Sequence, residues 1–103
     1  MVVSIVRFTS KLSADEVQTK FEDRADSYRH LPGLVEKIYV RFRDTGEFGA
    51  VYVWESDDAL ARFRESELAR SIPDAYRVEG AAEIELADVS LVVRPDLAPA
   101  PTR

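Results

Sequence analysis

Hydrophobic residues recur along this chain with two different periods, and the changes between them mark out six elements. Four segments rich in β-branched and aromatic residues are typical of strands: residues 2–9, 34–43, 48–55 and 82–93. Apolar residues three or four positions apart predict a helix over residues 13–30 and a second helix from residue 56. The predicted order is strand, helix, strand, strand, helix, strand.

Capping signals mark the ends of both predicted helices. Ser13 and Glu16 form a Ser-x-x-Glu capping box at the start of the first helix, and Pro32-Gly33 ends it. Ser56 is expected to cap the second helix, which residues 71–75 are expected to break. The boundaries therefore agree with the periodicity.

This order of elements is that of a ferredoxin-like βαββαβ fold, an α+β fold with an antiparallel sheet and both helices on one face. In the second strand one side carries apolar residues that we expect to pack on the helices: Leu34, Ile38, Val40 and Phe42. The other side is expected to stay open, and with the next strand it carries Lys37, Tyr39, Tyr52 and Trp54. An open aromatic face of this size is usually covered by a partner, so we expect a homodimer.

Composition narrows the class of protein. The 103 residues fit a single domain, expected over residues 1–93, followed by a flexible proline-rich tail over 94–103. The net charge of −5 argues against a nucleic-acid partner, and no apolar run approaches the roughly 20 residues that span a membrane. The absence of cysteine excludes disulfides and thiol catalysis, and it fits a cytoplasmic location.

Four short motifs carry a resemblance to a known family. They are Pro32-Gly33-Leu34, Lys37-Ile38-Tyr39, Gly49-Ala50-Val51-Tyr52-Val53-Trp54 and the helix segment Asp58-Ala59-Leu60-Ala61-Arg62-Phe63. Together they resemble the small YdhR-type monooxygenases of the dimeric α+β barrel superfamily, although Tyr39 stands where tryptophan is common and Ala50 replaces a second glycine. The resemblance implies a dimeric barrel and a cofactor-independent monooxygenase that uses O₂ on a small aromatic or polyketide-derived substrate.

The aromatic residues are the first candidates for that site. Tyr39, Tyr52 and Trp54, with Ala50 beside them, are expected to bind the substrate, and Tyr52 is also a candidate proton acceptor. The alternative is that they form only the dimer interface or a half-buried face of the sheet.

Basic residues are the second group of candidates. Lys37, Arg41 and Arg7 are expected near this face, where a cation would stabilise a substrate anion and a desolvated Lys37 could act as a base. The alternative is that they are solvated or paired with glutamates. His30, the only histidine, is either a general base or a surface residue at the end of the first helix.

The acidic residues lack the histidine or cysteine partners of a transition-metal site, so we expect no metal. That no other cofactor is needed is what the resemblance implies. Two further functions stay open at this point. The same residues could serve a cofactor-free cyclase or isomerase, and the aromatic face could belong to a non-catalytic ligand-binding or assembly protein.

Overall fold

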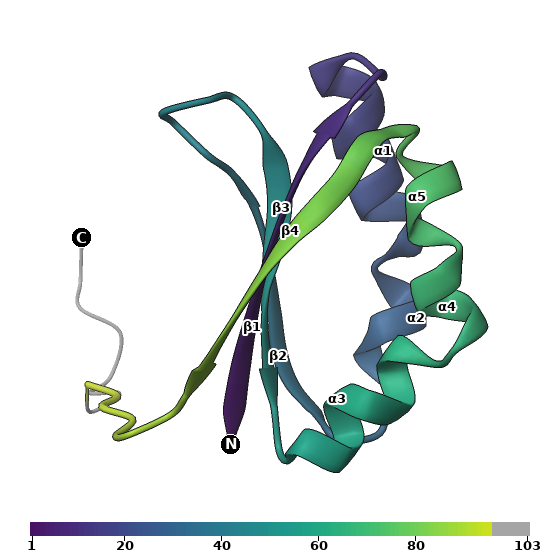
Figure 1. The fold of residues 1–103 in the computed structure, drawn as a ribbon. Helices are drawn as coiled ribbons and strands as arrows, with labels where there is room; N and C mark the ends of the chain where they lie inside the picture. Colours follow the sequence, from purple (N-terminus) through teal and green to yellow (C-terminus); the bar gives the residue numbers. More distant parts are fainter. Residues whose placement is uncertain (96–103) are drawn as a thin grey trace, which may run out of the picture.

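The protein, analysed as a computed structural model that describes residues 1–95, forms one antiparallel sheet with its helices on one side (Figure 1). The strands are β1 (Val2–Ser10), β2 (Leu34–Arg41), β3 (Phe48–Trp54) and β4 (Val78–Asp88), in the sheet order β2-β3-β1-β4. The helices are α1 (Ala14–Arg24), α2 (Asp26–Arg29), α3 (Asp57–Arg64), α4 (Glu67–Arg70) and α5 (Ile72–Ala75). This confirms the predicted ferredoxin-like α+β fold. The tail predicted over 94–103 lies from residue 96 onward outside the described residues.

The two helix starts form as the sequence predicts. The Glu16 amide donates to Ser13 Oγ at 3.2 Å, and the Ser13 amide donates to Glu16 Oε1 at 3.0 Å, which completes the capping box. Ser56 caps α3 by accepting a hydrogen bond from the Ala59 amide at 3.2 Å. These local hydrogen bonds fix where each helix begins and which side of it meets the sheet.

The predicted break at residues 71–75 is wrong, because the chain stays helical there. Ser66 caps α4 by accepting from the Ala69 amide, and Ile72–Ala75 then forms α5. Pro73 lies in the first turn of α5, where proline is tolerated because no amide is needed for the helix ladder. The helical layer is therefore longer than predicted.

The last strand begins and ends earlier than predicted. It starts at Val78, which pairs with Ser10, and its register shifts near Gly80, whose φ is +67°. Asp88 pairs with Val2 at the start of β1, so the residues that follow have no strand to pair with. The predicted strand over 89–93 is absent for that reason.

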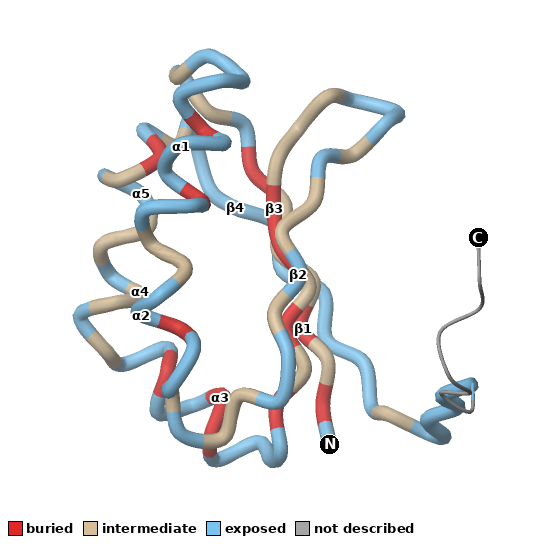
Figure 2. The backbone as a smooth tube through the Cα atoms, turned by 180° about the vertical axis from the view of Figure 1, so that it is seen from behind, coloured by how far each residue is buried: buried red, intermediate tan, exposed pale blue. Residues whose placement is uncertain are grey.

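The assignment of the two sheet faces is reversed relative to the prediction. Tyr52 is only 4% exposed and Trp54 is fully buried, both against the helices, whereas Ile38 is 47% exposed. Tyr39 stacks on Phe21 of α1 with ring centroids 4.4 Å apart. The large rings fill the space between sheet and helices, where they bury the most surface. Figure 2 colours the buried residues of the strands and helices red along the backbone.

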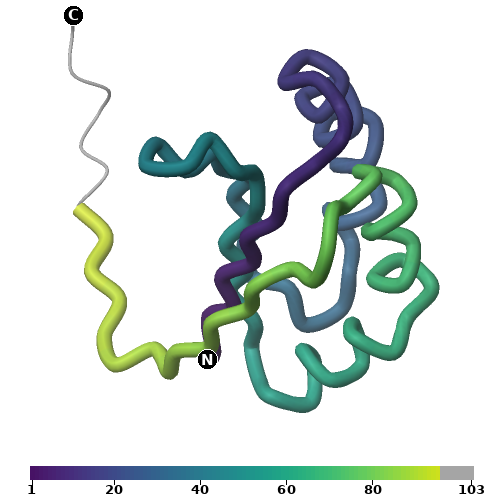
Figure 3. The backbone as a smooth tube through the Cα atoms, turned by 45° about the horizontal axis from the view of Figure 1, so that its top comes forward, coloured from purple at the N-terminus to yellow at the C-terminus, as the bar shows by residue number. Residues whose placement is uncertain are grey.

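The other side of the sheet is uncovered by helices in the described residues (Figures 1 and 3). We call it the open face, and its aliphatic residues are Val3, Ile5, Ile38, Val40, Val51 and Val53. Val51 lies at its centre, with Ile5 on one neighbouring strand and Ile38 on the other. The open face is therefore aliphatic, not aromatic as predicted.

Candidate functional site

The helix side of the sheet holds a lysine surrounded by tyrosine rings. The Lys37 Nζ lies 3.2 Å from the ring centroid of Tyr28, 4.3 Å from that of Tyr39 and 4.7 Å from that of Tyr52. Lys37 and Tyr39 come from β2, Tyr52 lies directly opposite Lys37 on β3, and Tyr28 comes from α2. We call Tyr28, Tyr39 and Tyr52 the tyrosine cage.

The tyrosine cage keeps the lysine amine out of water. Burial, helped by the positive charge of Arg24, lowers the pKa of Lys37 from its ordinary 10.5 to about 6. None of the ion pairs among the described residues includes Lys37. With a pKa of about 6, the amine is mostly neutral at pH 7.

Buried phenol groups surround the same amine. Within the described part of the chain, the hydroxyls of Tyr28, Tyr39 and Tyr76 are buried without a hydrogen-bond partner. Burial raises the pKa of each, to about 12 for Tyr76, and also raises the pKa of Tyr52. All four phenols are therefore protonated at neutral pH and available as hydrogen-bond donors.

Arg24 of α1 supplies a cation beside these phenols. Its Nη2 donates to the Leu68 carbonyl at 3.3 Å and to Ser71 Oγ at 2.9 Å, and its guanidinium carbon lies 5.7 Å from the Tyr76 ring centroid. Its Nε is buried without a partner in the described residues. The site thus combines a neutral amine, protonated phenols and a fixed positive charge.

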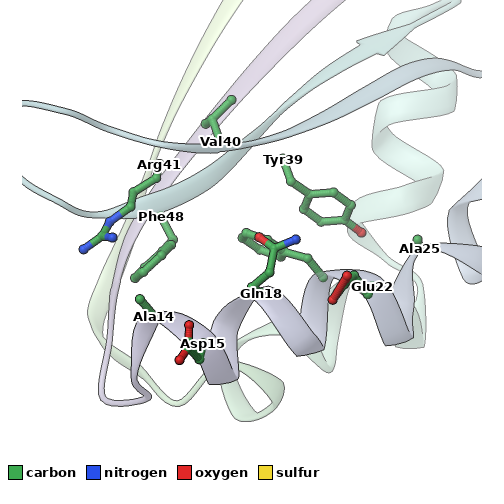
Figure 4. Close-up of a pocket in the computed structure, with 10 residues that line it drawn as sticks. Ala14, Asp15, Gln18, Glu22, Ala25, Tyr39, Val40, Arg41 and Phe48 are labelled. Atoms are coloured by element: carbon green, nitrogen blue, oxygen red, sulfur yellow. The ribbon is translucent and has the colours of Figure 1, made fainter.

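Two hollows on the β2 side lead to the tyrosine cage. The α1 groove, of about 480 Å³, runs between α1 and the strands β2 and β3 (Figure 4). The α2 pocket, of about 200 Å³, lies beside it and is lined by Lys37 and Tyr28. Tyr39 and Ala25 line both hollows, so the two hollows are adjacent. In Figure 4, Val40 points away from α1 while Tyr39 points toward the helical side.

A third hollow reaches the site from the β4 side. The β4 cavity, of about 300 Å³, lies between the strands β1 and β4 and the helices α3 to α5, and most of its lining is apolar. Tyr52, Val6 and Ile72 line both this cavity and an inner void of about 20 Å³. The inner void is also lined by Lys37, so it adjoins both the β4 cavity and this lysine.

Four of the residues predicted from the sequence meet at the inner void. Lys37, Tyr39, Ala50 and Tyr52 all line it. Trp54 shares their face of the sheet but is fully buried, donates from Nε1 to Ser4 Oγ at 3.2 Å, and lines none of these four hollows. The structure therefore places Trp54 in the core beside the site.

The other three predicted residues lie away from the amine. Arg7 is on the open face, where its guanidinium carbon stacks 3.8 Å from the Phe42 ring centroid and Nη1 pairs with Asp44 at 3.5 Å. Arg41 is exposed at the rim of the α1 groove, with its guanidinium carbon 5.1 Å from the ring centroid of Phe48. His30 is exposed at the end of α2. Arg7 therefore lies on the open face as expected, whereas Lys37 and Arg41 lie on the helix side, so the expectation that all three share the open face is wrong for Lys37 and Arg41.

Sequence reasoning missed Arg24, Tyr28 and Tyr76 as site residues. Tyr28 continues the apolar stripe of the first predicted helix, so its direction toward the sheet was visible in the sequence. Arg24 and Tyr76 carry no such signal, because their approach depends on how α1 and the turn before β4 pack together.

Residues 1–95 contain neither a metal-binding cluster nor a membrane-spanning helix. No group of three or more histidine, cysteine or acidic residues is arranged to hold a metal ion. No helix in this part of the chain has the length and apolar character needed to cross a bilayer.

Comparison of the sequence with protein families gives one match. The family described as "Putative mono-oxygenase ydhR" matches residues 3–80, which is more than half of the chain. A search of curated proteins finds no significant match.

Solved structures with the same fold include two named oxygen-using or haem-related proteins. One is the haem-degrader MhuD from Mycobacterium tuberculosis with two haems bound in its active site, at 24% identity and a TM-score of 0.72, covering 91% of this chain and 100% of that one. Another is a variant of SnoaB, a cofactor-independent oxygenase from Streptomyces nogalater, at 22% identity and a TM-score of 0.70, covering 91% and 97%.

A third similar structure has no known activity. It is the protein NE2512 from Nitrosomonas europaea, at 12% identity and a TM-score of 0.75, covering 92% of this chain and 94% of that one. At these identities the three structures establish the shared fold.

Proposed function

The chain belongs to the YdhR mono-oxygenase family, and we propose that it oxygenates a small aromatic or polyketide-derived substrate with O₂ and without a cofactor. One observation carries the proposal, namely the Lys37 amine held among three tyrosine rings beside unpartnered phenol hydroxyls. SnoaB, described as a cofactor-independent oxygenase, shares the fold. A neutral lysine amine shielded from water by aromatic rings is suited to act as a general base.

Lys37 is the proposed general base. Its neutral Nζ takes a proton from a phenol or enol of the substrate, and the resulting anion gives an electron to O₂. The substrate radical and superoxide combine into a peroxide, and loss of water from this peroxide leaves a quinone. One oxygen atom of O₂ therefore enters the product, and the other leaves in water. The substrate supplies all the electrons, and no outside reductant is needed.

The neighbouring groups stabilise the charge that develops. The protonated phenols of Tyr28, Tyr39 and Tyr52 donate hydrogen bonds, and Arg24 supplies the positive charge that a neutral Lys37 does not. Tyr52 is then a donor and not the proton acceptor considered from the sequence. His30 is too exposed at the end of α2 to take that role.

The β4 cavity is the proposed place for the aromatic body of the substrate. Its volume of about 300 Å³ and its mainly apolar lining suit a flat ring system, whose oxygen would point through the inner void toward Lys37. Ala82→Trp would fill this cavity from β4, and Gln18→Trp would fill the α1 groove instead. If the substrate binds in the β4 cavity, Ala82→Trp should lower the activity and Gln18→Trp should not.

Oxygen consumption tests the proposed activity. Metal-free protein is given a panel of anthrones and hydroquinones from pH 5 to pH 9. Wild-type uptake should rise through about pH 6 as Lys37 loses its proton. Lys37→Met should lower kcat by about 10²-fold or more, as expected for loss of a general base. The Lys11→Met variant, which replaces an exposed lysine, should keep full activity. Substrate-dependent uptake that survives in Lys37→Met would contradict the assignment.

The same proton transfer supports a second candidate function. A base beside protonated phenols also suits a cyclisation or isomerisation in which a proton leaves one atom and returns at another. Product analysis in the absence of O₂ separates the two functions. A product formed without O₂ and lost in Lys37→Met would favour the cyclase or isomerase.

The residues present do not fit the haem that MhuD binds. A haem needs an axial ligand, and the only histidine of this chain is exposed at the end of α2, away from the hollows around Lys37. The chain has no cysteine, and burial keeps the nearby phenols protonated. No step of the proposed reaction therefore involves haem.

A homodimer is also part of the proposal. The open face offers aliphatic residues from three strands, and a second copy of the same face would remove them from water. A cytoplasmic location stays a prediction, which cell fractionation would test.

A further inference from the structure

We propose that Lys37 also captures small carbonyl compounds by forming an imine, an activity separate from oxygenation. The amine is enclosed by three tyrosine rings, has no carboxylate partner among the described residues, and lines the α2 pocket of about 200 Å³. A lone amine beside an open hollow is the arrangement that nucleophilic attack on a carbonyl requires. The ligand class is a small aldehyde, and an aromatic ring on it would meet the tyrosine rings of the pocket.

The reaction is balanced without any added redox agent. The Nζ lone pair attacks the carbonyl carbon, a C–N bond forms as the carbonyl π bond breaks, and the carbonyl oxygen takes up a proton while the nitrogen releases one. The resulting carbinolamine loses water, which carries away the carbonyl oxygen, and the C=N bond of the imine forms. The hydroxyls of Tyr28 and Tyr39 have no partner in the described residues, so either phenol is free to donate that proton and to take up the one that the nitrogen releases.

The charges around the amine favour its free form. Arg24 repels an ammonium at Lys37 from the α1 side. Arg29 of α2 and Glu36 of β2 also line the α2 pocket, and neither forms an ion pair with Lys37. The tyrosine cage encloses the amine on the remaining sides. An amine in these surroundings keeps its lone pair at a pH where surface lysines have lost theirs to a proton.

The chain supplies its own controls. It has three lysines, and Lys11 and Lys20 are both exposed. Their amines are fully reachable by a dissolved aldehyde, and neither is enclosed by tyrosine rings as Lys37 is. Any preference for Lys37 is therefore due to its surroundings and not to access.

Reductive trapping tests the proposal. The full chain is incubated at pH 6.5 with 4-hydroxybenzaldehyde and sodium cyanoborohydride, which reduces an imine to a stable amine, and the adduct is mapped by peptide mass spectrometry. We expect labelling of Lys37 at least 10-fold faster than that of Lys11 or Lys20. Lys37→Arg should lose this adduct and keep the slow labelling of the other two lysines.

The outcome is read within the wild-type protein, so it does not depend on a variant that folds. Labelling of Lys37 no faster than that of Lys11 and Lys20 would overturn the proposal. The result is also independent of the proposed oxygenase activity, since the labelling needs no O₂. Trapping of Lys37 without oxygen uptake would support imine formation but not the oxygenase. Oxygen uptake without trapping would overturn imine formation and support only the role of Lys37 as a general base.

Discussion

Placing the Lys37 amine among three tyrosine rings costs free energy, because an ammonium loses its water there and gains no carboxylate in exchange. The protein avoids most of this cost by holding the amine neutral. The unpartnered hydroxyls of Tyr28 and Tyr39 add a further cost of the same kind. Sites that sacrifice stability in this way are often the sites of function.

The substitution Lys37→Met tests this cost. The pKa of Lys37 is about 6 in the folded protein and 10.5 ordinarily, so between these values the unfolded state binds more protons and stability rises with pH. Methionine keeps the apolar stem and removes the amine. We expect the free energy of unfolding at pH 7 to rise by about 2 kcal/mol. The gain should shrink as the pH approaches 10.

Urea unfolding of both proteins at pH 7 and pH 9.5 measures the difference. Lys20→Met, at an exposed lysine, is the matched control and should change stability by less than about 0.5 kcal/mol at either pH. A methionine variant at position 37 that is less stable than wild type at pH 7 would show that the amine is held as a stabilising cation.

At the residue scale the sequence identified about half of the site. Lys37, Tyr39 and Tyr52 are predictable because the alternation of a strand places them on one face, whichever face that is. Arg24 and Tyr76 are not, because their approach to the site depends on packing between elements far apart in the chain. Arg7 lies on the open face as predicted, whereas Lys37 and Arg41 were misplaced, because a single sequence did not show which side of β2 the helices cover.

At the scale of elements, the loop before β2 decides how closely α3 approaches the sheet. Gly33 has a φ of +81°, and its carbonyl accepts a hydrogen bond from the Glu55 amide at 2.8 Å. A methyl group at Gly33 would collide with the Cβ of Ala59 in α3. The loop and α3 therefore pack at a distance that only glycine allows.

The substitution Gly33→Ala is expected to destabilise the protein by two effects, a left-handed backbone and the collision with Ala59. Gly80→Ala is the matched control, because Gly80 also has a positive φ, of +67°, but a methyl group there meets nothing. We expect Gly33→Ala to lower the free energy of unfolding by about 2 kcal/mol more than Gly80→Ala. Thermal unfolding of the two variants measures this, and equal losses would contradict the contact.

Element order and helix starts were predictable, because capping residues and strand periods are local signals. The orientation of the sheet was not, because both faces are apolar, one with aromatic and one with aliphatic side chains. A register shift between Leu34 and Glu36 adds to this, since it places Leu34 opposite Trp54 on the helix side while Ile38 stays on the open face. A strict alternation counted from Leu34 therefore gave the wrong face.

At the scale of the whole molecule, a single copy leaves the aliphatic residues of the open face uncovered. Its residues come from β1, β2 and β3, and Val51 has aliphatic neighbours on both sides. Glu83 and Glu85 lie on the same side of the sheet along β4, beside Arg7 and Ile5. A second copy would cover the aliphatic part while these charges remain at its border.

The substitution Val51→Lys should therefore prevent the proposed dimer. A charge at the centre of the face would be buried without a partner in the dimer, at a cost of several kcal/mol. Sedimentation velocity should show a dimer for wild type and a monomer for the variant. Ala61→Lys, at an exposed position of α3, should stay dimeric. A wild-type monomer at high concentration, or a dimeric Val51→Lys, would contradict the assignment of the interface.

The central claim is that the protein holds a neutral amine at Lys37, and the proposed base and the proposed imine both depend on it. The most direct measurement is an NMR titration of protein labelled with ¹³C at lysine, in which only three side chains give signals. We predict that the Lys37 signal titrates near pH 6. Three lysine signals of which none titrates near pH 6 would contradict the account.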